Sequence, residues 1–180
     1  MTADGAAFTV RRGAAGDAAV LAAFMARTFQ ETFGAQNSPE DIAAHAARSY
    51  GASQQARELA SPDVITLLME QGTQLAAFAQ VRRGEAPPCV TGPSPVELHR
   101  FYVDAPWHGS GAARQLMGEV LGAARALGGR TLWLGVWERN PRAIRFYEKC
   151  GFTIAGTQDY FVGSDRQYDR VMVAALPPNA

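Results

Sequence analysis

One helical pattern with an apolar strand on either side constrains the fold more than any other part of the sequence. From 109 to 127, apolar residues recur at intervals of three and four, which is the period of an amphipathic helix. Gly128 and Gly129 follow and end that helix. Apolar runs typical of strands occupy 96–103 before it and 131–137 after it. A strand–helix–strand crossover of this kind predicts two neighbouring parallel strands.

Around this crossover, the sequence predicts antiparallel strand pairs and shorter helices. Ser38 and Pro39 form a helix start. The other predicted strands are 8–12, 64–69, 75–81, 152–161 and 168–175, with turns at 71–73 and 163–165 and a surface loop at 83–95. The other predicted helices are 17–33, 38–60 as one helix or a broken pair, and 140–150.

These elements predict an α/β (α+β) fold. We expect a mixed, mostly antiparallel sheet of six to seven strands, flanked by about four helices and containing the strand–helix–strand crossover. A chain of 180 residues has the size of one domain. Residues 1–180 are therefore expected to form a single domain, with an ordered core over about 7–176.

Composition excludes several classes of protein. Lys and Arg number 17, as do Asp and Glu, and the sequence has no basic face of the kind that nucleic-acid binding requires. Cys89 and Cys150 are far apart, and no Cys or His pair has the spacing of a metal site. The N-terminus lacks a signal-peptide pattern, and no apolar run approaches the roughly 20 residues of a membrane span. We expect a cytoplasmic protein without a metal, a nucleic-acid partner or membrane contact.

Small residues open the crossover helix, in the segment His108-Gly109-Ser110-Gly111-Ala112-Ala113-Arg114. They leave the first backbone amides of the helix uncovered, where these amides lack intrahelical partners and the helix dipole adds partial positive charge. Such a turn is suited to a pyrophosphate, although a strand-to-helix turn that is merely tight would look the same. It lacks the spacing of a Rossmann fingerprint and the Lys-Ser/Thr pair of a P-loop.

A second segment, from Trp137 to Phe152, is more specific. Asn140 and Pro141 start a short helix, and Gly151 ends it. Taken singly, its residues are explained as a cap, helix formers, core aromatics and a stop. The occurrence of this segment together with the glycine turn, at this separation along the sequence, is not explained in that way.

Together, the two segments resemble the GNAT superfamily of N-acetyltransferases. The coenzyme A motif of that family runs Gln/Arg-x-x-Gly-x-Gly/Ala, and 108–113 matches it except that His108 stands where Gln or Arg is usual. The second motif runs Asn-x-x-Ala-x-x-Phe-Tyr-x-x-x-Gly-Phe, and it is matched in full by Asn140, Ala143, Phe146, Tyr147, Gly151 and Phe152. The order of elements fits the family over nearly the whole chain. The resemblance implies a GNAT-like sheet and an acetyl-CoA-dependent N-acetyltransferase.

The resemblance also implies where acetyl-CoA binds as co-substrate. Asn140 is expected to hydrogen-bond the amide arm of the cofactor as well as to cap its own helix. His108 either donates a hydrogen bond to a phosphate or is an exposed loop residue, and Arg142 is a further candidate for a phosphate. The backbone of Phe101, Tyr102 and Val103 is expected to pair with the pantetheine arm. The pyrophosphate is expected at the amides of Gly109, Ser110, Gly111, Ala112, Ala113 and Arg114.

Two residues are expected to carry the chemistry. Tyr147 occupies the family position of the acid that protonates the leaving thiolate, for which a hydroxyl is suitable. An alkyl amine with a pKa near ~10.4 is only about one part in a thousand neutral at pH 7, so a base must remove a proton. Glu97 resembles the strand glutamate that serves as base in protein-acetylating members, with His99 and a bound water as alternatives. Strict alternation along the strand would place Glu97, His99, Phe101 and Val103 on one face.

The expected acceptor is a primary amine of a small molecule or a peptide, bound between the first two helices and the last hairpin. Residues of those regions that suit a cationic amine are Phe29, Glu31, Phe33, Tyr50, Asp159, Tyr160, Phe161, Asp165 and Tyr168. The segments 98–104 and 165–172 resemble bacterial members that acetylate small amines such as polyamines. A non-catalytic acetyl-CoA-binding module and a different nucleotide-binding protein are the alternatives, and the sequence leaves a homodimer open.

Overall fold

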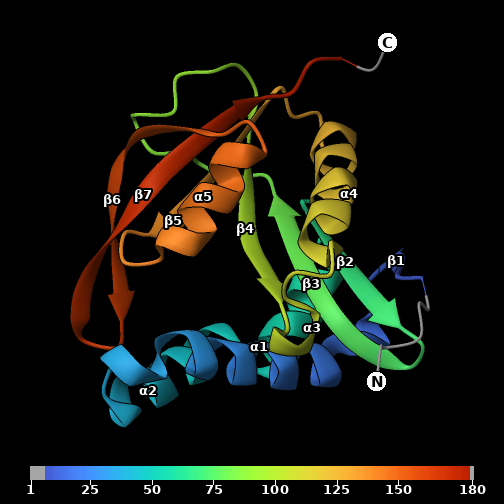
Figure 1. The fold of residues 1–180 in the computed structure, drawn as a ribbon, viewed down its shortest axis with the longest axis vertical. Helices are drawn as coiled ribbons and strands as arrows, with labels where there is room; N and C mark the ends of the chain where they lie inside the picture. The colour runs from blue at the N-terminus through green and yellow to red at the C-terminus, as the bar shows by residue number, and fades with distance from the viewer. Residues whose placement is uncertain (1–6, 179–180) are drawn as a thin grey trace.

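Seven strands form one sheet in the computed structural model, which describes residues 7–178 (Figure 1). The strands are β1 (Thr9–Arg12), β2 (Val64–Gln71), β3 (Gln74–Arg82), β4 (Pro95–Val103), β5 (Thr131–Trp137), β6 (Thr153–Val162) and β7 (Asp165–Ala175). Their order in the sheet is β1-β2-β3-β4-β5-β7-β6. Every neighbouring pair is antiparallel except β4 and β5, which are parallel. The predicted mixed sheet with one parallel crossover is confirmed.

Five α-helices within residues 7–178 flank this sheet. They are α1 (Ala18–Phe33), α2 (Pro39–Ser49), α3 (Ala52–Ala60), α4 (Ala112–Ala126) and α5 (Pro141–Lys149). The segment 38–60 is a broken pair because Gly51 is extended, with φ −58° and ψ 147°, and ends the helical run between α2 and α3. This break accounts for the fifth helix.

The helices bury an apolar core on each face of the sheet. One core joins α4 and α5 to the sheet and includes the inaccessible side chains of Leu116 and Leu132. The other joins α1, α2 and α3 to the opposite face through Phe29 and Phe78. In Figure 1 the first three helices lie together at the bottom of the view, and α4 and α5 lie above them. Each fully buried side chain of this size contributes about 1.5–3 kcal/mol, so both layers are tightly held.

The two parallel strands stay together for only a short distance. β4 and β5 pair over Pro95–Glu97 and Thr131–Trp133. Beyond that point β4 bonds only to β3, and β5 bonds only to β7. The facing edges of β4 and β5 therefore carry backbone N–H and C=O groups without a strand partner, and such groups need a partner from solvent or a ligand.

β4 contains a β-bulge. Gln80 of β3 pairs with Arg100, but the next residue, Val81, pairs with Leu98. His99 is therefore an extra residue on β4, and an extra residue of this kind shifts the alternation of side chains between the two faces.

The bulge corrects one expectation about β4. Glu97 and His99 lie on the same face as Tyr102, towards a cavity described below. Phe101 and Val103 instead pack into the core on the α4 side. The expectation that Glu97, His99, Phe101 and Val103 share a face is wrong, because it assumed an uninterrupted strand.

Two element boundaries differ by three residues from the sequence-based ones. α4 begins at Ala112 rather than at 109, after a short 3₁₀ turn at Ala105–Trp107. β7 begins at Asp165 rather than at 168, because Gly163 and Ser164 alone form the turn that joins it to β6. The first six and last two residues of the predicted single domain lie outside the described residues.

Among the helices of residues 7–178, none has the length and apolarity needed to cross a membrane.

Candidate active site

The predicted pyrophosphate turn lies at the N-terminus of α4. Gly109 and Gly111 have φ values of 78° and 91°, a region that glycine adopts without steric cost. A Cβ atom at either position would meet nothing within 4 Å, so the space over the turn is open. Ala112 is fully buried, and its amide donates to Ser110 Oγ at 3.3 Å. The turn thus presents a small, open surface at the end of the helix where the backbone amides lack intrahelical partners.

α5 begins beside this turn. Asn140 caps α5, because its Oδ1 accepts a hydrogen bond from the Ala143 amide at 3.1 Å. Arg142 Nη1 donates to His108 Nδ1 at 3.0 Å, so the proton of the neutral imidazole is on Nε2, which donates to the Val103 carbonyl at 2.8 Å. The two motif segments are therefore in contact. A bond from His108 to a phosphate stays a prediction, and it requires one of these two contacts to break.

Tyr147 lies on α5 with its ring against the sheet. The ring packs on Phe101, Phe146 and Phe152, at centroid separations of 6.2, 5.4 and 5.7 Å. Its hydroxyl forms no hydrogen bond with any residue of 7–178. Burial raises the pKa of Tyr147, with a smaller contribution from Tyr102, so the hydroxyl keeps its proton at neutral pH. The group is a protonated donor without an internal acceptor.

Glu97 is held by two neighbours. Its Oε2 accepts a hydrogen bond from Arg82 Nε at 2.5 Å, and its Oε1 lies 3.2 Å from His99 Nδ1. Burial favours a higher pKa for Glu97, but the hydrogen bonds and charges of His99 and Arg82 outweigh it and lower the pKa. Both carboxylate oxygens are therefore occupied, and the carboxylate is a weak base.

His99 completes a carboxylate–histidine pair with Glu97. Burial lowers the pKa of His99 and outweighs the opposing effect of Glu97, so the imidazole is neutral at pH 7. A neutral ring that donates Nδ1–H to Glu97 leaves a lone pair on Nε2. No hydrogen bond to that Nε2 occurs among residues 7–178. Of the two predicted bases, His99 presents the free acceptor atom, and Glu97 orients it.

Glu97 and His99 line a cavity of about 360 Å³ against the face of the sheet that carries α1, α2 and α3, whereas Tyr147 lies in the core on the opposite face. Its size is that of a small-molecule pocket. The aromatic residues around it are Phe33, His45, Tyr50, Tyr102, Trp133, Trp137 and Tyr160. Its acidic residues are Glu97, Asp159 and Asp169. Among the described residues, no group of three or more His, Cys, Asp or Glu side chains is placed to hold a metal ion.

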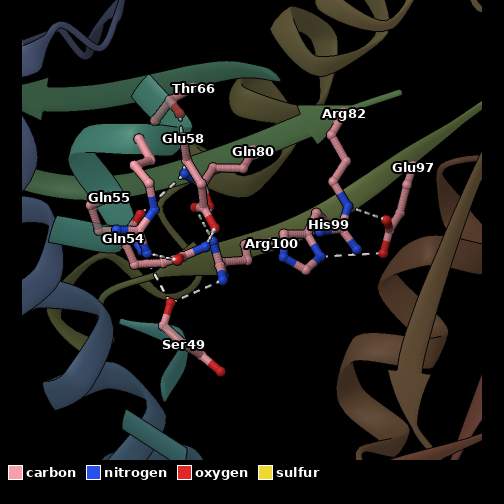
Figure 2. A network of polar contacts seen from close by, with 11 residues as sticks. Ser49, Gln54, Gln55, Glu58, Thr66, Gln80, Arg82, Glu97, His99 and Arg100 are labelled. Carbon is pink, nitrogen blue, oxygen red and sulfur yellow. Dashed lines mark hydrogen bonds and ion pairs between the residues drawn. The ribbon is translucent and has the colours of Figure 1, made fainter. Parts of the chain in front are cut away.

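A buried polar network fixes one wall of the cavity (Figure 2). The Arg100 guanidinium donates to Glu58, to Gln80 and, at 3.1 Å, to the carbonyl of Ser49. Figure 2 shows His99 beside this network on the same strand. Because Glu58 neutralises Arg100 and the other contacts satisfy its N–H groups, this arginine holds the bulged part of β4 against α3 and β3.

Part of the predicted acceptor region lines the cavity. The side chains that do so are Phe33, Tyr50, Asp159 and Tyr160. Those that do not are Phe29, Glu31, Phe161, Asp165 and Tyr168. Phe29 is a core residue with no exposed surface, and Phe161 is 51% exposed on the outer side of the hairpin.

Asp169 and Trp133 are among the cavity residues that were not predicted from the sequence. Asp169 is 6% exposed, and burial raises its pKa to about 6 against the opposing hydrogen bond from Gln158. Trp133 lines the same cavity, and its indole N–H has no hydrogen-bond partner among the described residues. One pattern in the sequence points to Asp169: it lies two positions before the buried Val171, on the inward face of an alternating strand.

Comparisons with known proteins agree on one family. The acetyltransferase (GNAT) family model matches residues 23–152. An uncharacterised N-acetyltransferase of Mycobacterium bovis is 36% identical over 160 residues, which cover 89% of this chain and 98% of that protein. Another, from Lactobacillus delbrueckii subsp. lactis, is 30% identical over 149 residues, or 83% of this chain and 86% of that protein.

A solved structure shares the fold. The crystal structure of PaiA N-acetyltransferase from Thermoplasma acidophilum, in complex with coenzyme A, superposes with a TM-score of 0.76 at 18% identity. The match covers 94% of this chain and 99% of that chain. The family match spans most of the chain and contains both the glycine turn and the Asn140–Phe152 segment. The chain therefore belongs to the acetyltransferase (GNAT) family and is an N-acetyltransferase.

Proposed function

We propose that the protein transfers the acetyl group of acetyl-CoA to a primary amine of a small molecule or peptide by direct attack. The observation that carries this proposal is the opening between β4 and β5. It has the glycine turn and the cap of α5 on one side, and the cavity with His99 on the other.

The described residues fit acetyl-CoA in three respects. The facing edge of β4 beyond Glu97 has no strand partner, so the backbone of 101–103 can pair with an extended amide-containing arm. The turn at Gly109 and Gly111 is open where side chains would otherwise stand, which suits a pyrophosphate at the amides of α4. The side-chain nitrogen of Asn140 is available to the arm, because only the oxygen is used for capping. Acetyl-CoA, when bound, supplies the acetyl group as a reactive thioester.

His99 and Glu97 provide a route for the amine proton. A primary ammonium must lose a proton before its nitrogen can attack a carbonyl carbon. His99 Nε2 is a free acceptor in the cavity wall, and the Glu97 carboxylate stabilises the imidazolium that forms when the proton arrives. Glu97, predicted as the base, is thus proposed to act through His99.

Tyr147 is proposed to supply the second proton. As the new carbon–nitrogen bond forms and the carbon–sulfur bond breaks, the departing thiolate needs a proton. The Tyr147 hydroxyl is protonated at neutral pH and has no acceptor among the described residues, which suits it to that donation.

A thiol-release assay tests the proposal. Acetyl-CoA would be incubated with the protein and with a panel of polyamines, amino acids, aminoglycosides and peptides, and products identified by mass spectrometry. We expect free CoA and a mono-acetylated product with at least one amine, and a loss of about 10²-fold or more in kcat for His99→Gln, as for removal of a general base. Stoichiometric binding of acetyl-CoA without thiol release on any amine would instead identify a non-catalytic acetyl-CoA-binding module.

The cavity favours small cationic amines within that panel. Glu97 and Asp159 are paired with arginines, but Asp169 has no arginine partner among the described residues and supplies negative charge, and the nearby Trp133 and Trp137 suit an ammonium group. We therefore propose a small-amine or polyamine acceptor, in line with the resemblance of 98–104 and 165–172 to members of that kind.

A further inference from the structure

Asp169 is a buried carboxylate with no cationic partner among the residues that the structure describes. It lies on β7, lines the cavity and accepts a hydrogen bond from the neutral amide of Gln158. No ion pair to it occurs among residues 7–178. The other two carboxylates of the cavity differ in this respect, because Glu97 pairs with Arg82 and Asp159 with Arg166.

The backbone of β5 makes room for this carboxylate. A Cβ atom at Gly135 would lie 2.8 Å from Asp169 Oδ2 and 2.6 Å from Gln158 Nε2. Both groups therefore lie directly over the Cα of Gly135, between Trp133 and Trp137 on the same face of β5. A side chain at position 135 would fill the space that the carboxylate now occupies. The site is thus built from three strands, β5, β6 and β7.

Charge makes the position of Asp169 unfavourable in the free protein. An ionised carboxylate that is removed from water is costly unless a cation or several donors compensate it. Here the compensation is one neutral amide, with tyrosine and tryptophan side chains around it. A cationic group entering the cavity would supply the missing partner, and the tryptophan faces would add a further attraction.

The carboxylates of Asp169 and Glu97 lie at different places in the cavity. Glu97 is next to Trp133 in the sheet, whereas the Asp169 carboxylate lies over Gly135, two residues further along β5. With about 3.3 Å per residue along a strand and about 4.8 Å between strands, the two carboxylate positions are roughly 8 Å apart. One ammonium cannot contact both, but a short diamine can.

We propose that Asp169 binds a second cationic group of the acceptor, distinct from the amine that is acetylated, so that the preferred acceptors are short diamines. This inference rests on the proposed function, because it assumes that the reacting amine lies at His99. The Gly135 cradle holds the carboxylate in place for the distal ammonium, and the room between Asp169 and the rest of the cavity selects the chain length.

Paired amines of equal length provide the test. kcat/KM would be measured for 1,4-diaminobutane and 1-aminobutane with the wild type, Asp169→Asn and the control Asp63→Asn, an exposed carboxylate outside the cavity that pairs with Arg83. Asparagine has the same shape as aspartate and keeps a hydrogen bond to Gln158 possible. We expect the Asp169→Asn variant to lose at least tenfold in kcat/KM for the diamine, mostly through KM. The monoamine should change by less than twofold, and the control should match the wild type with both. An equal loss with both amines, or no loss with the diamine, would overturn the proposal.

A second measurement separates this inference from the proposed function. Thermal unfolding of the protein with and without 1,4-diaminobutane requires no acetyl transfer. We expect the diamine to raise the melting temperature of the wild type and of Asp63→Asn but not that of Asp169→Asn. If no amine is acetylated yet this pattern is found, the proposed chemistry fails and the Asp169 site stands. If amines are acetylated and the shift is the same in all three proteins, the Asp169 site fails alone.

Discussion

Tyr147 holds its proton in an apolar environment, between three aromatic rings. Replacing it by phenylalanine removes the hydroxyl and leaves this packing in place. We expect Tyr147→Phe to lower kcat by about 10²-fold or more, as for the loss of a general acid, with the dissociation constant for acetyl-CoA unchanged. Steady-state kinetics and calorimetric titration with acetyl-CoA measure the two quantities. Turnover equal to that of the wild type would rule out the acid role.

Asp169 makes the stability of the protein depend on pH. Its pKa is about 6 in the folded protein and about 3.9 in an unfolded chain, so the folded state binds more protons between these values. Stability contributed by this group is full below about pH 4 and is lost as the pH rises through 6. We expect Asp169→Asn to be more stable than the wild type by about 2–3 kcal/mol at pH 8, and equally stable at pH 4.

Urea denaturation at the two pH values measures this difference, with Asp63→Asn as the matched control. A gain in stability that is the same at pH 4 and pH 8 would show that the effect comes from packing and not from ionisation.

The residues of the candidate site differ in how well their places and contacts can be predicted from the sequence. Asn140 and Tyr147 are found because one contiguous segment contains both, with a cap, a helix and a stop at fixed spacing. Asp169 and Gly135 are brought together by the pairing of β5 with β7, and no local pattern encodes that register. His108 matches the glycine-turn motif imperfectly, and its contacts with Arg142 and Val103 depend on where α5 begins.

At the scale of elements, α4 offers two glycines with opposite roles. Gly111 precedes the helix with φ 91°, where a side chain is strained, whereas Gly118 lies inside the helix, where an added Cβ atom would meet nothing within 4 Å. We expect Gly111→Ala to destabilise the protein by roughly 1–2 kcal/mol and to weaken acetyl-CoA binding. Gly118→Ala should stabilise it by about 0.5–1 kcal/mol without affecting binding. Denaturation and acetyl-CoA titration of both variants provide the measurement, and the same response from the two would contradict the special role of the turn.

Elements with a regular apolar pattern are predicted well from the sequence. Both α4 and β5 have such patterns: the bounds of β5 are those predicted, and α4 ends within one residue of its predicted end although it begins three residues later. The bulge in β4 is not predicted, because Arg100 is a buried charged residue whose partners Glu58 and Gln80 come from α3 and β3. Alternation rules cannot place such a residue before its partners are known.

At the scale of the whole molecule, the sheet is joined across β4 and β5 by only the short pairing at Pro95–Glu97. Amides on the open edge exchange with solvent through local openings. We expect acetyl-CoA to slow hydrogen exchange of the amides of 98–103, because its arm is proposed to pair with that edge. Exchange in β2, which is paired on both sides, should not change. Mass spectrometry of peptides from the two strands measures both, and unchanged exchange on β4 would contradict the proposed pairing.

The bulge at His99 has a consequence for how acceptor preference can diverge among related proteins. Beyond it, consecutive side chains of β4 lie on different faces of the sheet, since Tyr102 faces the cavity while Phe101 packs on the side of α4 and α5. A substitution at 102 can reshape the acceptor cavity without altering the packing around Tyr147. Deleting His99 would instead remove the bulge, so that each later residue of β4 would face the opposite side of the sheet. If the cavity binds the acceptor as proposed, its shape can therefore change through substitutions on β4 but not through a change in the length of the strand.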